Sequence, residues 1–193
     1  MALDLLGKTG FGQLELNQVA FRRDGRIEAQ CKLDSTEFES APAENGMLLA
    51  VNNITRTVTK ADTDDIGINP IGLHYSTEHM YDDRASALKD FALELGSFLP
   101  RIGYLSVGDK FTTNLVGIDD DDTTGYASET VLTTALAAAT LATTPVYGGV
   151  HDDAPGIITL SKATFATGPL FKVTKLTTMP DGQKAVQLQV LRA

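Results

Sequence analysis

Apolar and polar residues alternate along several short stretches of this chain, and this two-residue period is typical of half-buried β-strands. Residues 27–33 and 185–191 show the alternation most clearly. Between such stretches lie Gly, Asp, Asn and Pro residues at intervals of 8–12 residues, which favours a β-sandwich or a barrel. The pattern therefore predicts a mainly β fold.

Turn dipeptides divide these stretches into expected hairpins. Asp24-Gly25 readily takes the positive φ angles of a tight turn, so we expect residues 13–33 to form the first hairpin. Asn52-Asn53 predicts a second hairpin over 47–59, and Gly108-Asp109 predicts a third over 102–116. Further strands are expected at 156–160, 170–176 and 185–191, the last two joined by a turn at Pro180-Asp181-Gly182.

A single short helix is predicted between the second and third hairpins. Leu88, Phe91, Ala92 and Leu95 have the i, i+3, i+4, i+7 spacing of an apolar helical face. Asp82 or Asp83 can cap its start, and Gly96 suits the left-handed residue that ends a helix. We expect this helix to pack against the sheet.

The Ala- and Thr-rich residues 127–149 allow two interpretations. Val131, Leu132, Leu136 and Ala139 fit a helix, whereas the Thr content and Pro145 fit a strand or a loop, which we favour slightly. The sequence thus predicts a β-sandwich or barrel of about nine to ten short strands with one short helix. Residues 1–12, broken by three glycines, are expected to be an extended N-terminal arm, and residues 13–193 a single β-rich domain.

Charge narrows the range of partners. The chain carries 16 basic and 25 acidic residues, a net charge of -9, and its basic residues are scattered. Because nucleic-acid binding depends on Lys and Arg contacts to phosphates, we expect no nucleic-acid partner. No stretch approaches the roughly 20 apolar residues that cross a bilayer, so we expect no membrane partner. The early acid in MALDLLGKTGFG argues against a secretory signal.

Each candidate catalytic or ligand-binding motif in the sequence lacks a residue that the motif requires. Gly7-Lys8-Thr9 has no glycine five positions earlier, as a phosphate-binding loop requires. An EF-hand frame begun at Asp120 places Val131 where a bidentate Glu is needed. No G-x-S-x-G elbow is present. We therefore predict a non-enzyme with no catalytic residue and no cofactor.

Metal ligands and a reactive thiol are not expected either. His74 and His79 lie five residues apart, on opposite faces of a strand, and His151 stands with two acids in a loop. Zinc sites require closer ligand spacing than these three histidines offer. The lone cysteine, Cys31, shares the apolar face of its strand, so we interpret it as a small buried hydrophobe.

The central part of the chain resembles a known family. The resemblance covers roughly residues 44–116 and rests on four segments in order, Asn45-Gly46-Met47-Leu48-Leu49, His79-Met80-Tyr81-Asp82-Asp83, Leu88-Lys89-Asp90-Phe91 and residues 100–112, PRIGYLSVGDKFT. This order is similar to that of small virion structural proteins of tailed bacteriophages, which are taken to be head-associated. Residues 1–12 and 127–145 depart from that pattern.

The resemblance implies a capsid decoration or cement protein, found in the virion and assembled in the host cytoplasm. Its partners would be the major capsid protein and copies of itself, since such proteins are commonly homo-oligomers. We expect Leu5, Leu6 and Phe11 of the arm to contact the capsid. Two alternatives stay open: a head-fibre base or tail or connector protein, and a ligand- or carbohydrate-binding β module.

Overall fold

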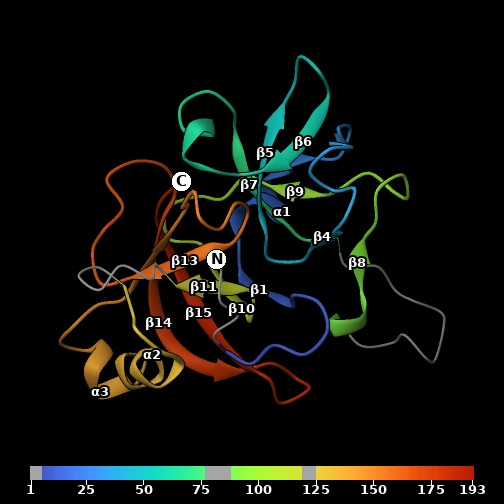
Figure 1. The fold of residues 1–193 in the computed structure, drawn as a ribbon. Coiled ribbons are helices and arrows are strands. Elements are labelled where there is room, and N and C mark those ends of the chain that lie inside the picture. The colour runs from blue at the N-terminus through green and yellow to red at the C-terminus, as the bar shows by residue number, and fades with distance from the viewer. Residues whose placement is uncertain (1–5, 77–87, 119–124) are drawn as a thin grey trace.

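A computed structural model describes residues 6–76, 88–118 and 125–193, and these form a mainly β structure (Figure 1). A seven-stranded sheet occupies the lower part of the view in Figure 1. Its strands, in spatial order, are β1 (Leu14–Gln18), β10 (Lys110–Thr113), β15 (Lys184–Arg192), β14 (Leu170–Thr178), β12 (Tyr147–Gly149), β13 (Ile158–Ser161) and β11 (Val116–Ile118). Neighbouring strands are antiparallel except for the parallel pair β11 and β13.

A six-stranded sheet lies above it. Its spatial order is β2 (Ile27–Glu28), β9 (Ile102–Gly103), β7 (Ile71–His74), β5 (Leu48–Asn52), β6 (Thr57–Lys60) and β3 (Lys32–Leu33). A separate pair joins β4 (Ala43–Glu44) to β8 (Ala92–Leu93). The described helical pieces are short: α1 (Ala20–Asp24), η1 (Thr63–Asp65), η2 (Leu88–Asp90), α2 (Glu129–Ala135) and α3 (Ala138–Leu141). None of them is long and apolar enough to cross a membrane.

One hydrophobic core joins the two sheets. Leu48 and Leu73 from the upper sheet and Phe111 and Phe171 from the lower sheet belong to the same buried cluster. The rings of Phe111 and Phe171 meet edge to face, with centroids 5.7 Å apart. A second cluster, containing Leu49, Val51 and Val58, lies on the other face of β5. Because β5 is covered on both faces, its sequence is a continuous apolar run.

The expected mainly β class is confirmed, as are two of the expected strand pairings. β5 and β6 form the hairpin predicted over 47–59. β14 and β15 form the hairpin that closes at Gly182, whose φ of 88° requires a glycine-like residue. The described residues form fifteen strands rather than nine or ten, because several are only two residues long.

The hairpin expected over 13–33 is wrong. β1 pairs with β10, and β2 pairs with β9 in the other sheet. The helix α1 separates the two strands, and Gly25 ends it with a φ of 68° while the Arg26 N–H bonds to the Phe21 carbonyl. The Asp24-Gly25 dipeptide therefore ends a helix. The positive φ of Gly25, which was expected in a tight turn, is equally suited to the residue that follows a helix.

The hairpin expected over 102–116 is also wrong. β9 pairs with β2 and β7, whereas β10 pairs with β1 and β15. The turn itself is present, since Gly108 has a φ of 94°, but it passes the chain from one sheet to the other. Asp109 secures the crossing, because its carboxylate accepts the N–H groups of Ala20 and Ser106, both at 2.9 Å.

The helix expected to begin at Asp82 or Asp83 is wrong in its described part, and residues 82–87 lie outside the described residues. Residues 88–90 form the single turn η2, and Ala92–Leu93 form β8, which pairs with β4. Gly96 has the expected left-handed conformation, with a φ of 79°, but in a turn. Pairing with β4 outweighs the weak helical spacing of the sequence.

The preference for strand or loop over residues 127–149 is wrong for residues 129–135 and 138–141, which are helical. Ser128 caps α2 by accepting the Val131 N–H, and α3 follows. Leu132 and Leu136 of this region are buried in the main core. The helical interpretation was the better one, because the apolar positions that the sheet covers have helical spacing. Only β12 is a strand here.

Candidate functional site

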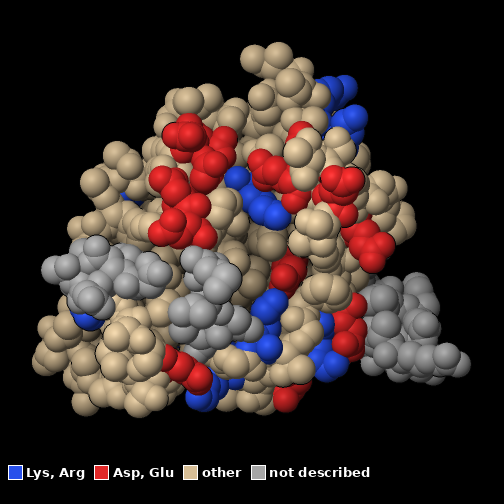
Figure 2. All heavy atoms as spheres, in the orientation of Figure 1, with Lys and Arg blue, Asp and Glu red and all other residues tan. Residues whose placement is uncertain are grey.

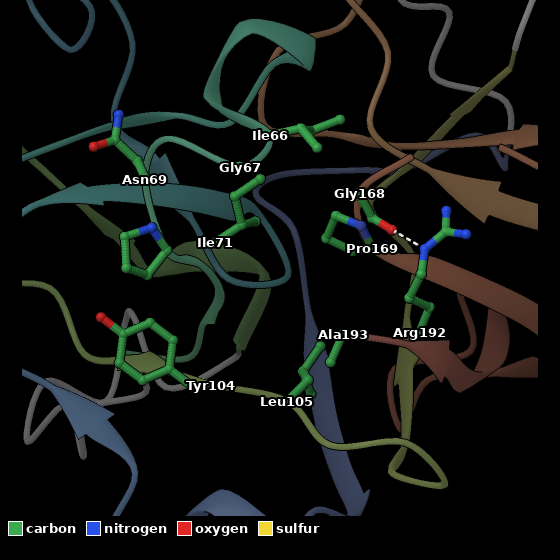
Figure 3. Close-up of a pocket in the computed structure, with 11 residues that line it drawn as sticks. Ile66, Gly67, Asn69, Ile71, Tyr104, Leu105, Gly168, Pro169, Arg192 and Ala193 are labelled. Carbon is green, nitrogen blue, oxygen red and sulfur yellow. Dashed lines mark hydrogen bonds between the residues drawn. The ribbon is translucent and has the colours of Figure 1, made fainter. Parts of the chain in front are cut away.

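A pocket with a volume of about 520 Å³ lies where the two sheets meet (Figure 3). Its walls come from the loop before β7, the residues after β9, the loop before β14 and the last residues of β15. The lining residues are Ile66, Gly67, Asn69, Pro70, Ile71, Tyr104, Leu105, Gly168, Pro169, Arg192 and Ala193.

The polar groups of this pocket serve mainly to hold its walls. Arg192 donates through Nε to the Gly168 carbonyl at 2.6 Å and through Nη2 to the Phe165 carbonyl at 2.8 Å. Asn69 donates to the Asp65 carboxylate at 2.8 Å. Burial raises the pKa of Tyr104, so its phenol stays neutral. The lining thus offers hydrogen bonds but no nucleophile paired with a base.

A serine and a histidine do touch elsewhere, at the end of β7. His74 Nδ1 donates to the Glu44 carbonyl at 2.9 Å, so Nε2 is the acceptor for the Ser76 hydroxyl, also at 2.9 Å. Ser76 Oγ in turn accepts the Arg101 N–H at 2.8 Å. Both side chains are buried, and burial lowers the pKa of His74 to about 4. This network ties three segments together inside the protein.

An exposed apolar loop, residues 94–99, is the feature best suited to bind another molecule. Leu95, Phe98 and Leu99 are 40%, 67% and 49% exposed, and we call these three residues the Phe98 surface. Ser97 holds the loop as a turn, because both its N–H and its hydroxyl donate to the Glu94 carbonyl, at 3.2 and 2.6 Å. The turn therefore presents its large side chains to solvent in a fixed arrangement.

Grooves of about 420 and 290 Å³ flank the Phe98 surface. The larger is bounded on its far side by residues 32–35, which include β3, the edge strand of the upper sheet. The smaller is bounded by Ala29, Ser76, Leu93 and Arg101 in addition to Phe98 and Leu99. An apolar loop beside a sheet edge offers a partner both hydrophobic contact and backbone hydrogen bonds.

The described part of the arm packs on its own domain. Leu6 is buried in the main core, Phe11 is half-buried, and Leu5 lies outside the described residues. Lys8 forms an ion pair with Glu44 at 2.6 Å, and the Phe11 N–H donates to the Lys89 carbonyl at 2.7 Å. Of the two expected capsid contacts that are described, Leu6 is covered and Phe11 is partly open.

Carboxylates gather over η1, at the upper left of Figure 2. Asp62 caps η1, and Asp152 accepts a hydrogen bond from the Thr63 N–H at 3.1 Å, which joins the two acidic loops. Asp153 lies 3.5 Å from His151. Within the described residues, no group of three His, Cys, Asp or Glu side chains could hold a metal ion. Residues 119–122 and His79 lie outside them.

The lone cysteine is part of the hydrophobic packing. Cys31 is buried in the second hydrophobic cluster, and burial raises the pKa of its thiol. Sequence patterning does not reveal the Phe98 surface, because the spacing of Leu95 fits the expected helical face. Its signal was the run Leu95-Gly96-Ser97-Phe98-Leu99, in which a Gly-Ser turn separates large apolar residues.

No family model, no curated protein and no solved structure matches this chain.

Proposed function

We propose that this chain is a decoration protein of a tailed-phage head, which binds the outer surface of the shell and stabilises it. The observation that carries the proposal is the Phe98 surface, three large apolar side chains exposed together on a braced loop. Clustered exposed apolar residues mark contact sites, because their burial in a complex is favourable. The resemblance over residues 44–116 supplies the kind of partner, the major capsid protein.

Other properties support an assembly role over catalysis. The net charge of -9 favours the outside of the head, where the chain does not meet packaged DNA. The large pocket of Figure 3 lacks a paired nucleophile and base among its lining residues. The two sheets share one closely packed core, so the domain should be stiff. A stiff domain suits the bridging of neighbouring capsid subunits.

The N-terminal arm, residues 1–12, is also proposed to contact the capsid, but Leu6 is not free to do so while the arm stays packed on its own domain. Leu6 lies in the core of its own domain, so it could reach a capsid protein only if residues 6–12 left that domain. Deleting residues 1–12 is therefore expected to lower stability as well as loading. Deleting only residues 2–5 keeps Leu6, Lys8 and Phe11. If the shorter deletion reduces loading while the melting temperature is unchanged, the arm contributes contacts of its own.

The test of the proposal compares two charge insertions at exposed apolar positions. Phe98→Asp disrupts the Phe98 surface, whereas Ile54→Asp changes an isolated side chain, 94% exposed, in the β5–β6 turn. Both variants are expected to fold as the parent does. Loading onto expanded heads, measured by cosedimentation, should fall at least tenfold for Phe98→Asp and stay at the parental level for Ile54→Asp.

Equal loading of Phe98→Asp and the parent would overturn the proposed contact surface. Copy number separates a decoration protein from the alternatives. Hundreds of copies per particle support decoration, whereas a few copies at one vertex indicate a head-fibre base, tail or connector protein.

A further inference from the structure

A further pocket, distinct from the Phe98 surface and open to solvent, lies beside α2 and α3 and has a volume of about 350 Å³. These two helices are at the lower left of Figure 1. The lining residues that matter here are Tyr126, Val131, Thr134, Ala135, Val146 and Lys162. Its volume is at the lower end of the range for small-molecule sites, about 300–1,000 Å³.

One side of this pocket is apolar. Val131, although 45% exposed, belongs to α2 and lines the pocket together with Ala135 and Val146. The threonines add methyl groups, and the Thr134 hydroxyl is already used, since it donates to the Thr130 carbonyl at 2.9 Å. The pocket can therefore accept an apolar body without leaving that hydroxyl unpaired.

The other side carries two hydrogen-bond donors. Tyr126 is only 2% exposed, and its hydroxyl has no hydrogen-bond partner among the described residues. The Lys162 ammonium lies 5.3 Å from the centroid of the Tyr126 ring, and within the described part of the chain it forms no ion pair. Burial raises the pKa of Tyr126 to about 12, so the phenol keeps its proton at neutral pH.

We propose that this pocket binds an amphipathic monocarboxylate, with its alkyl or aromatic body against α2 and its carboxylate held by Tyr126 and Lys162. No acceptor among the described residues uses the Tyr126 hydroxyl, so it can donate to a ligand acceptor that enters the pocket. A carboxylate is the matching group, because it accepts from both donors and its single charge balances one ammonium. This site does not depend on the proposed role in a phage head.

The experiment titrates octanoate, octanol and octylamine into the full ¹⁵N-labelled chain and follows amide shifts by NMR. Octanoate is expected to bind at least tenfold more tightly than octanol, and octylamine more weakly still. The shifts should saturate and centre on α2, α3 and Lys162. Lys162→Met should remove the preference for octanoate, whereas Lys175→Met, which removes the same charge from an exposed position on β14, should keep it.

Tyr126→Phe separates a binding role from a structural one. Because the hydroxyl has no partner, its removal should leave the stability of the free protein unchanged or slightly higher. The affinity for octanoate should nevertheless fall severalfold. Thr134→Trp, which fills the pocket from an exposed position of α2, should abolish binding of octanoate and octanol.

Two results would overturn the proposal. Octanol binding as tightly as octanoate would show that the donors do not recognise a carboxylate. Unchanged octanoate affinity in both Lys162→Met and Tyr126→Phe would place the ligand elsewhere.

Discussion

Buried polar residues of this protein differ sharply in how well they are satisfied. His74 and Asn114 have partners on both sides of their side chains, whereas the Asn45 carboxamide has none among the described residues. A buried polar group without a partner costs stability, and a paired one is costly to remove.

His74 should make the protein sensitive to mild acid. Its pKa is about 4 in the folded chain, because burial disfavours the charged ring, against an ordinary value near 6.5 when unfolded. Above pH 6.5 the His74 ring is neutral in both the folded and the unfolded chain, so the free energy of unfolding is at its full value. As the pH falls from 6.5 to about 4 the unfolded chain takes up the proton first, so this residue alone should remove about 3 kcal/mol of stability.

Urea unfolding of the parent and of His74→Gln between pH 7.5 and 4 measures this effect. The variant is less stable at neutral pH but should show a shallower loss toward acid, since it lacks the titrating ring. Parallel pH profiles for the two proteins would show that His74 is not the group responsible.

Asn45 and Asn114 should respond in opposite directions to the same substitution. Both are fully buried, but Asn114 accepts the Gln13 N–H at 2.7 Å and donates to Gln183 at 3.3 Å. Asn45→Leu should therefore be neutral or stabilising, whereas Asn114→Leu should cost about 1–3 kcal/mol through the unpaired Gln13 N–H. Denaturant midpoints of the two variants check the contrast, and equal losses would contradict it.

At the scale of elements, close packing decides the pairing that local sequence leaves open. α1 lies against β9, because the Phe21 ring fills the space above Gly103. A Cβ on Gly103 would come within 2.4 Å of the Phe21 ring carbons. The sequence predicts turns at Gly25 and Gly108, and both have positive φ. What it does not indicate is the partner strand, because pairing depends on contacts between residues far apart in the chain.

Gly103→Ala should thus be markedly destabilising. The added methyl group must displace the buried Phe21 ring, and overpacking of this kind typically costs about 1–3 kcal/mol. Gly117→Ala is the matched control in β11, since its nearest neighbour would be Ile157 Cγ2 at 3.5 Å, an ordinary contact. Thermal unfolding should show a lower melting temperature for the first variant only. Equal melting temperatures would mean that the ring moves aside at little cost.

The whole molecule combines two sheets around one core. Leu48 and Leu73 of the upper sheet are buried together with Phe111 and Phe171 of the lower sheet. Crossings between the sheets occur repeatedly, as at Gly108-Asp109, where the Asp109 carboxylate bonds to segments on both sides. Neither sheet can expose its inner face without exposing that of the other, so the two should unfold together.

Calorimetry and hydrogen exchange test this cooperativity. A single thermal transition is expected, with slow amides in β5 and β15 exchanging at the same free energy. Gly103→Ala, although it lies in the upper sheet, should lower protection in β15 by the same amount as in β5. Two separate transitions, or an effect confined to the upper sheet, would show two independent domains.

The sequence alone determined the properties that depend on neighbouring residues. The mainly β class, the hairpins β5–β6 and β14–β15, and the glycine turns follow from alternation and from backbone conformations that glycine favours. The tertiary structure decided the rest: two sheets that exchange strands, helices over residues 129–141, and the exposure of Phe98. These depend on which surfaces cover one another, and that coverage comes from residues distant in the chain.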